Sequence, residues 1–196
     1  MFSGEDKKTR IFQVALELFA EKGFANTSVD EIVDRAGVAK GTIYYHFKGK
    51  DDLFLMLMKS GVDFLNEAIR EAAVGESDPI RRLDTIIATQ VRLFIDHPDF
   101  YKVLMSEIWW LEARQHEDLQ KIRKSYLSIL EEAIQAGQTA GALRPDIDVE
   151  MAAPALFGLI SHVTLQVVLD SPKPQFSRAH RAVTDVFLGG ILKPRA

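Results

Sequence analysis

Residues 28–47 read SVDEIVDRAGVAKGTIYYHF, and this stretch predicts two short helices separated by a tight turn. Apolar residues in its first half recur at the spacing of a helix that buries one face. Gly37 follows them, and glycine is the residue type that most often ends a helix in a left-handed turn. A second helix then runs from Lys40 to about Phe47, too short to bury much of itself. Helix, turn and short helix are the outline of a helix-turn-helix.

The exposed face of the second helix has the composition that DNA recognition requires. In a helix-turn-helix this helix enters the major groove, where it meets phosphates and base edges. We expect Ile43 and Phe47 to point inward. The outward positions carry donors, hydroxyls, flat rings and one residue without a side chain: Lys40, Gly41, Thr42, Tyr44, Tyr45 and His46. Taken one by one, these tyrosines could be ordinary partly buried aromatics; their joint placement favours DNA contact.

Charge in this region also favours a polyanion. The whole chain has a formal net charge of −4, but residues 37–50 contain lysines and a histidine and no acid. Two helix starts flank the unit and offer free backbone N–H groups to phosphates. Either Thr27 or Ser28 can cap the first, because each precedes a carboxylate by three residues. Lys50, with Lys48 beside it, begins the second.

Three segments closely resemble the N-terminal domain of the tetracycline-repressor (TetR) family: ALELFAEKGF (residues 15–24), TSVDEI (27–32) and AGVAKGTIYYHFKGKDDL (36–53). Order, spacing and residue identity agree from about residue 7 to 54, roughly a quarter of the chain. Gly49 departs mildly, at a position where Asn or Ser is expected. The rest of the chain resembles the family only in length and helicity.

The resemblance implies a role for each residue of this face. Lys40, Gly41 and Thr42 would face bases, although Lys40 may equally hold a phosphate. Tyr44 and His46 would contact bases or phosphates, and Tyr45 would lie against the sugar-phosphate backbone. Thr27 or Ser28 would bind one phosphate and Lys50 another.

Apolar positions recur at three and four residues throughout, and no alternating run reads as a hairpin, so we predict an all-α chain. About nine helices are expected: 7–22, 28–36, 40–47, 50 to the loop before 79, 79–96, 99–111, 117–139, 149–169 and 177–191. We expect residues 5–65 to form a TetR-type helix-turn-helix domain, with the helix-turn-helix at 28–47. Residues 66–196 would form a helical ligand-binding and dimerisation domain.

The resemblance also implies a largely apolar ligand cavity in the later helices. The predicted lining residues are Phe64, Phe94, Tyr101, Trp109, Trp110, Tyr126, His162 and Gln166. Consecutive Trp109 and Trp110 cannot both face one core, so one of them points to a pocket or an interface. His162 and Gln166 lie one turn apart on an uncharged helix. They fit hydrogen bonding across a subunit boundary equally well.

Residues 151–169 carry no charged side chain and approach the length that crosses a bilayer. Pro154, several polar residues and acidic flanks favour a buried or subunit-interface helix instead. A single helix-turn-helix rarely holds DNA tightly, and the usual solution is a two-fold dimer. We expect the helix at 149–169, with Gly158 for close approach, and the helix at 177–191 to form a four-helix bundle with a second copy.

Other classes are disfavoured by composition. The absence of Cys excludes disulfide scaffolds, zinc ribbons and thiol catalysis. The start of the chain is polar and shows no signal peptide, so we expect a cytoplasmic protein. His116-Glu117 lacks the second His of a zinc-protease motif, and the histidines are far apart. We therefore expect no enzyme, no catalytic residue, no metal site and no cofactor.

The sequence thus predicts a DNA-binding transcriptional regulator, in this family most often a ligand-responsive repressor. It would bind a palindromic operator as a homodimer and be released by a small, largely apolar effector. The expected partners are double-stranded operator DNA, that effector and a second copy of the chain, with no membrane. An architectural DNA binder without an effector is the competing hypothesis.

Overall fold

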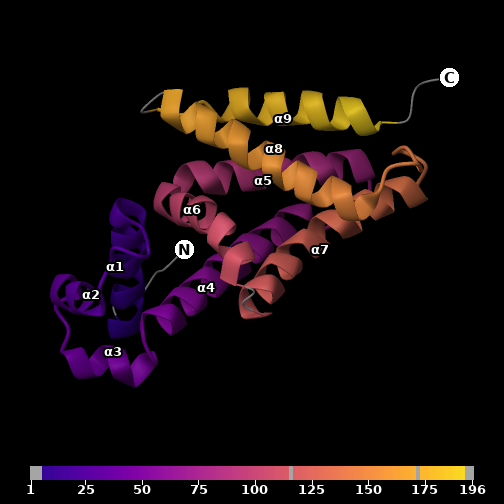
Figure 1. Cartoon of the computed structure of the whole chain (residues 1–196). Coiled ribbons are helices and arrows are strands. Elements are labelled where there is room, and N and C mark those ends of the chain that lie inside the picture. The colour runs from indigo at the N-terminus through magenta and orange to yellow at the C-terminus, as the bar shows by residue number, and fades with distance from the viewer. Residues whose placement is uncertain (1–5, 115–116, 171–172, 193–196) are drawn as a thin grey trace. The chain divides into compact units, whose positions relative to one another are not determined.

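The computed structural model describes residues 6–114, 117–170 and 173–192, with residues 107–114 described by their backbone alone. Over these residues it consists of helices and one isolated bridge, which confirms the all-α prediction (Figure 1). The helices are α1 (Lys7–Lys22), α2 (Val29–Ala36), α3 (Lys40–His46), α4 (Lys50–Ala73), α5 (Pro79–Asp96), α6 (Pro98–Arg114), α7 (Glu117–Thr139), α8 (Val149–Asp170) and α9 (Phe176–Ile191). Each predicted helix is present, with its ends shifted by less than one turn.

The chain packs into two compact units. Unit 1 comprises Met1–Phe64 and His97–Ile122, and unit 2 comprises Leu65–Asp96 and Arg123–Ala196. The long helix α4 contributes to both units, and α6 belongs to unit 1 because it packs against α1. This division describes packing. The functional domain limits at 5–65 and 66–196 stay a prediction.

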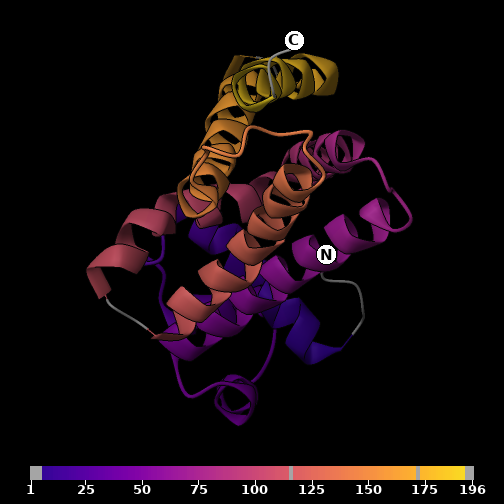
Figure 2. The same cartoon turned by 90° about the vertical axis from the view of Figure 1, so that its right-hand side faces the viewer.

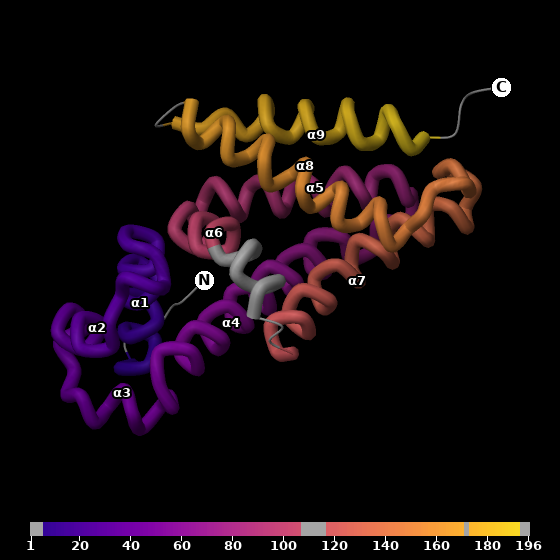
Figure 3. Tube along the Cα trace, in the orientation of Figure 1, coloured from indigo at the N-terminus to yellow at the C-terminus, as the bar shows by residue number. Residues whose placement is uncertain are grey.

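Unit 1 is built on α1, whose ends are fixed by short-range hydrogen bonds. The Asp6 carboxylate caps the helix by accepting from the Thr9 N–H at 3.0 Å. Gly23 ends it with φ of 80°, and its N–H donates to the Phe19 carbonyl. The buried face of α1 packs against α2, α3 and α6. Figure 3 shows the tube of α2 turning sharply into α3.

A close helix contact in unit 1 requires one glycine. Gly61 of α4 lies directly against the Phe100 ring of α6, and a Cβ atom at position 61 would be 2.1 Å from Phe100 Cε2. No side chain fits at that distance without moving the ring or the backbone. Gly61 therefore sets the approach of α4 to α6.

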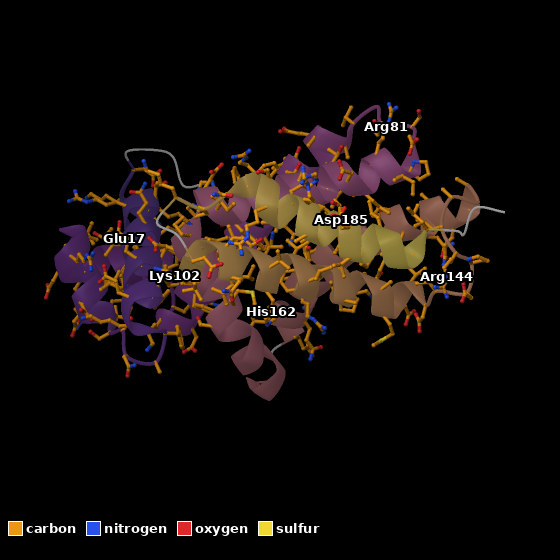
Figure 4. All side chains as sticks on the ribbon, turned by 90° about the horizontal axis from the view of Figure 1, so that it is seen from above. Glu17, Arg81, Lys102, Arg144, His162 and Asp185 are labelled. Atoms are coloured by element: carbon orange, nitrogen blue, oxygen red, sulfur yellow. The ribbon has the colours of Figure 1, made fainter. Side chains whose placement is uncertain are left out.

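Unit 2 is centred on three mutually packed helices, α5, α8 and α9, and α9 lies beside α8 (Figures 1 and 2). The segment after α7 is tied to the end of α9, since Leu143 forms an isolated antiparallel bridge with Leu192. The Arg144 N–H also donates to the Ile191 carbonyl at 3.0 Å. Arg144 is labelled at this end of the helix in Figure 4.

Helix α8 has the length and apolar composition of a membrane span, judged by those criteria alone. It packs against α5 and α9, and 39% of its most apolar window is buried within the chain. Exposed apolar side chains remain on α8 and α9, namely Met151, Leu169 and Val186. A single such helix is weak evidence for a membrane, since core helices meet the same criteria.

Candidate nucleic-acid interface

The turn between α2 and α3 has the geometry of a helix-turn-helix. Gly37 adopts a left-handed conformation, with φ of 61° and ψ of 39°, and its N–H donates to the Asp34 carbonyl. The Val38 N–H donates to the Val33 carbonyl at 3.3 Å. These bonds end α2 and redirect the chain into α3 within three residues. The glycine predicted to make the turn is thus the residue that makes it.

The N-cap of α2 is Ser28, which decides between the two residues predicted to cap this helix. The Ser28 hydroxyl accepts from the Glu31 N–H at 3.1 Å and is exposed. Thr27 is only 2% exposed, and its hydroxyl donates to the Gly23 carbonyl at 3.0 Å. The Thr27 side chain therefore does not present itself to a phosphate as predicted. Ser28 retains that predicted role.

Helix α3 is held by two side chains and presents the rest outward. Ile43 and Phe47 are buried as predicted, and the Phe47 ring lies 5.5 Å from the Phe12 ring of α1. Tyr44 is 52% exposed and Tyr45 is 84% exposed, so neither tyrosine serves the core. Exposed aromatic side chains beside polar residues are typical of a binding surface. This exposure favours DNA contact over the alternative of partly buried aromatics.

Gly41 lies in the first turn of α3 and is exposed. A Cβ atom at this position would meet nothing within 4 Å, and the backbone is helical. The fold therefore gives no reason for a glycine here. Thr42 and His46, on the same short helix, are half-buried. An absent side chain between Lys40 and Thr42 leaves room for a second molecule to approach the backbone closely.

Lys40 forms an ion pair with Asp30 of α2, at 2.6 Å between Nζ and Oδ1. The hydrogen bond to Asp30 raises the pKa of Lys40 above its usual value, so this side chain stays charged at neutral pH. Both side chains are exposed, and exposed ion pairs contribute little to stability. Lys40 can therefore exchange Asp30 for a phosphate or a base edge at small cost.

Lys50 does not have the position predicted for a phosphate ligand. Its ammonium donates to the carbonyls of Phe24 and Thr27, both at 2.8 Å, and more weakly to that of Ala25 at 3.4 Å. It also lies 4.4 Å from the centre of the Phe24 ring. An ammonium has three N–H donors, so these contacts occupy all of them. Lys50 thus ties the start of α4 to the α1–α2 loop.

The N-terminus of α4 is also less open to phosphate than predicted. The Asp52 carboxylate accepts from the Lys48 N–H at 2.9 Å and places a negative charge at the helix start. The Lys48 side chain itself is exposed. The second predicted phosphate site contains Lys48 and Lys50, and of these two it is the Lys48 side chain that faces solvent.

Exposed ion pairs also join α2 to α1. Arg35 donates to Glu21 at 2.8 and 3.0 Å and to Glu17 at 3.2 Å, and Glu17 is labelled in Figure 4. The guanidinium lowers the pKa of Glu21, and the carboxylate raises the pKa of Arg35. Lys22 pairs with Glu31 in the same region. Glu17 and Glu21 of α1 thus share the single guanidinium of Arg35.

Comparison with known proteins agrees with this geometry. Residues 11–57 match the family model of bacterial regulatory proteins of the tetR family. Residues 76–165 match the model of the tetracyclin repressor-like C-terminal domain. The chain belongs to the TetR family of transcriptional regulators. The matches cover a TetR-type DNA-binding region and a TetR-type C-terminal region, and this family is a class of regulators rather than of enzymes.

Full-length relatives share this organisation. The fatty acid metabolism regulator protein of Bacillus subtilis (strain 168) is 26% identical over 185 residues, 94% of this chain and 95% of the relative. The crystal structure of the transcriptional regulator FadR from Bacillus subtilis, in complex with stearoyl-CoA, is 27% identical with a TM-score of 0.80. The structural match covers 93% of this chain and 98% of the FadR chain. The fatty acid degradation regulator FadR from Bacillus halodurans has the same fold, with a TM-score of 0.83, 24% identity, and coverage of 96% and 97%.

The residues predicted to line an effector cavity in this TetR-family chain are divided between the two units. Phe94 and Tyr126 are buried in unit 2, whereas Tyr101 is buried in unit 1. Phe64 is half-buried in unit 1, with its ring 5.6 Å from that of His97. The side chains of Trp109 and Trp110 lie outside the described residues.

His162 and Gln166 are exposed on α8, where Figure 4 labels His162. His162 Nδ1 lies 2.9 Å from the Gly158 carbonyl oxygen, and Gln166 donates to Asp170 at 2.7 Å. Neither residue is in the interior of unit 2, so their prediction as cavity residues is not supported. Of the two roles proposed for them, the exposure favours a subunit boundary.

Sequence reasoning missed the polar residues that are buried in unit 2. Gln90 is fully buried on α5, and its Oε1 accepts from the Tyr126 hydroxyl at 2.6 Å. Burial raises the pKa of Tyr126 far above its ordinary range, so the phenol stays neutral. Gln90 occupies a position on the apolar stripe of α5, where Ile86 and Ile87 are also buried. A polar residue at an apolar register position was the available signal.

Proposed function

We propose that this TetR-family regulator is a repressor that binds a palindromic operator as a homodimer and leaves it when a small, largely apolar effector binds. The observation that carries the proposal is the surface of α3. Ile43 anchors the helix, while Lys40, Tyr44 and Tyr45 face solvent together. Such a surface fits the major groove, with Ser28 and Lys48 beside it for phosphates.

Base reading falls to the start of α3 in this proposal. Lys40 and Thr42 reach base edges, and Gly41 lets the backbone approach them. Tyr44 and His46 contact bases or phosphates, and Tyr45 lies along the sugar-phosphate backbone. The assignment follows the family's helix-turn-helix, with each residue on α3 of this chain.

The dimer is proposed to form through α8 and α9. Met151, Leu169 and Val186 are apolar and exposed on these helices, and a Cβ atom at Gly158 would meet nothing within 4 Å. A second copy would cover these side chains and place two α3 helices for half-sites about 34 Å apart or a multiple of it. The single membrane-length helix is then explained by a protein interface, and the regulator acts on DNA in the cytoplasm.

Light scattering tests the interface. Val186→Glu places a charge on this surface and is expected to give a monomer at micromolar concentration. Val74→Glu makes the same change at a valine that is 79% exposed outside α8 and α9, and should leave the dimer intact. A dimeric Val186→Glu variant, or a monomeric unmodified protein, would contradict the proposed interface.

The effector is proposed to be a long-chain fatty acyl thioester. Support comes from the relative solved in complex with stearoyl-CoA, which this chain matches over nearly its whole length. Binding needs to favour the DNA-incompetent state by only about 1 to 3 kcal/mol to change DNA affinity about 5- to 150-fold. Helices α4 and α7 each contribute residues to both units, and we propose α4, which leads from the DNA-binding region, as the helix through which such a preference acts.

The central experiment selects bound sequences from random duplex DNA and measures affinity for the selected operator by fluorescence anisotropy. Lys40→Ala and Tyr44→Ala should weaken binding without lowering the melting temperature, because both side chains are exposed. Affinity should fall steeply with salt as phosphates exchange their counterions for protein cations. Stearoyl-CoA should then release the operator.

Several results would count against parts of this proposal. An affinity that does not change with salt would exclude the phosphate contacts. Failure to bind any duplex at low ionic strength would refute DNA recognition by α3. Binding that no small molecule reverses, across acyl thioesters, aromatics, flavonoids and cationic drugs, would favour an architectural DNA binder without an effector.

A further inference from the structure

Buried hydrogen-bonding groups are left unpaired in the described part of unit 2. Asn66 Oδ1, Gln90 Nε2 and Thr164 Oγ1 are buried and have no hydrogen-bond partner. They belong to α4, α5 and α8, and all are at most 3% exposed. In unit 1, by contrast, the buried hydroxyl of Thr27 is hydrogen-bonded. Buried polar atoms without a hydrogen-bond partner often mark a site where water or a ligand binds.

The geometry around Gln90 leaves one amide atom unpaired in either orientation. In the structure Oε1 accepts from the Tyr126 hydroxyl, and Nε2 has no acceptor. Reversing the amide would let Nε2 donate to Tyr126 and would leave Oε1 unpaired instead. The Tyr126 ring is fixed in turn by Phe157 of α8, with ring centres 5.1 Å apart. Gln90 is therefore held in place with a hydrogen-bonding group unused.

The polar groups buried in the described part of unit 2 are uncharged. They are the amides of Asn66 and Gln90 and the hydroxyls of Ser161, Thr164 and Tyr126. A carboxylate or phosphate buried beside any one of these groups would lose its hydration, and the buried polar residues described in unit 2 include no cation to compensate it. A neutral ligand oxygen loses far less, and it gains the N–H groups of Gln90.

We infer that the interior of unit 2 binds a neutral hydroxyl or ketone oxygen of the effector, with Gln90 as its hydrogen-bond donor. The inference rests on the proposed function, because it specifies the chemistry of the proposed effector. A plain saturated chain would leave Gln90, Asn66 and Thr164 unpaired. A hydroxyl accepts from Gln90 and can donate in turn, so a hydroxylated or oxidised acyl chain fits this interior better.

Calorimetric titration of the full-length protein tests the preference. The probes are stearoyl-CoA and its 3-hydroxy, 10-hydroxy and 12-hydroxy derivatives, which place the oxygen at different depths. At least one hydroxylated probe is expected to bind about tenfold more tightly than stearoyl-CoA, the effect of one good hydrogen bond in a buried site. This comparison uses the unmodified protein and does not depend on any variant folding.

A double variant, Gln90→Leu with Tyr126→Phe, assigns the preference to this pair. It removes both partners of the buried hydrogen bond together, so neither polar group is left buried without its partner. Circular dichroism establishes that it is folded, and the tenfold preference should disappear. Gln135→Leu is the matched control, since it makes the same change at an exposed position of α7 and should keep the preference.

The outcomes separate this inference from the proposed function. Equal affinities for plain and hydroxylated chains, or a preference that survives in the folded double variant, would overturn it and leave these atoms to buried water. Operator release by stearoyl-CoA is a separate measurement that tests the proposed function alone. If no acyl thioester binds, decan-2-ol and decan-2-one become the probes. Their binding in a Gln90-dependent manner supports the inference, and no binding overturns it.

Discussion

Replacing Gly41 with Ala should make the protein more stable and a weaker DNA binder. The new methyl group meets nothing within 4 Å, and position 41 is helical. Alanine is favoured over glycine in a helix by about 0.5 to 1 kcal/mol. For a chain of this size the melting temperature should rise by about 1 to 4 °C. The methyl group would also stand where DNA approaches α3, and losing one close contact costs about 1 to 3 kcal/mol of binding, or about 5- to 150-fold.

Thermal melting and operator anisotropy on the same preparation measure both effects. Ala136→Gly is the matched control, because it makes the reverse change at an exposed position of α7, away from the proposed interface. It should lower the melting temperature and leave operator affinity unchanged. A Gly41→Ala variant with full affinity would refute the reasoning that this glycine serves DNA approach. A Gly41→Ala variant with a lower melting temperature would show that the added methyl group collides with other atoms of the chain.

Three further results are expected. Gly61→Ala should destabilise the fold by about 1 to 3 kcal/mol in urea unfolding, because its methyl group overlaps the Phe100 ring; an unchanged midpoint would mean that the helices separate freely. Ile43→Asp should cost more than about 4 kcal/mol by burying an unpaired charge, and wild-type melting would show that α3 is oriented differently. The pKa of Glu21 is lowered by Arg35, so its contribution is present above the unfolded-state pKa and lost as the pH falls through the folded-state value. The melting temperature should therefore decrease as the pH is lowered below about 4, and it should decrease less in Glu21→Gln. Equal pH profiles for the two proteins would exclude the Glu21–Arg35 pair as a source of this acid sensitivity.

The parts of the interface that sequence predicted correctly depend on local chain geometry. Helical periodicity placed Ile43 inside and Tyr44 outside, and the conformational freedom of glycine placed the turn at Gly37. These properties are determined by residues a few positions apart. The same is true of the helix ends, which the sequence located to within one turn.

The residues that sequence misplaced are those whose environment is set by distant segments. Lys50 follows the turn in the chain, but its long side chain reaches carbonyls about two dozen residues earlier, at Phe24 and Thr27. His162 and Gln166 lie on a helix whose composition is apolar on every side, so periodicity does not indicate which face is buried. Gln90 was overlooked for the opposite reason, because a polar residue on an apolar stripe was not weighed as a signal.

Several residues of α3 are unfavourable for helix stability, and those residues lie on its exposed side. The helix has seven residues, and its N-cap Ala39 makes no side-chain hydrogen bond. Gly41 lowers helix propensity, and Tyr44 and Tyr45 are exposed without packing in the core. Isolated helices of this length do not persist in water, so α3 depends on Ile43 and Phe47 for its structure. Violations of local stability that are restricted to one face are expected where that face serves binding. The same residues that make α3 a poor helix therefore make it a suitable surface for a second molecule, which is why stability and operator affinity should change in opposite directions at Gly41.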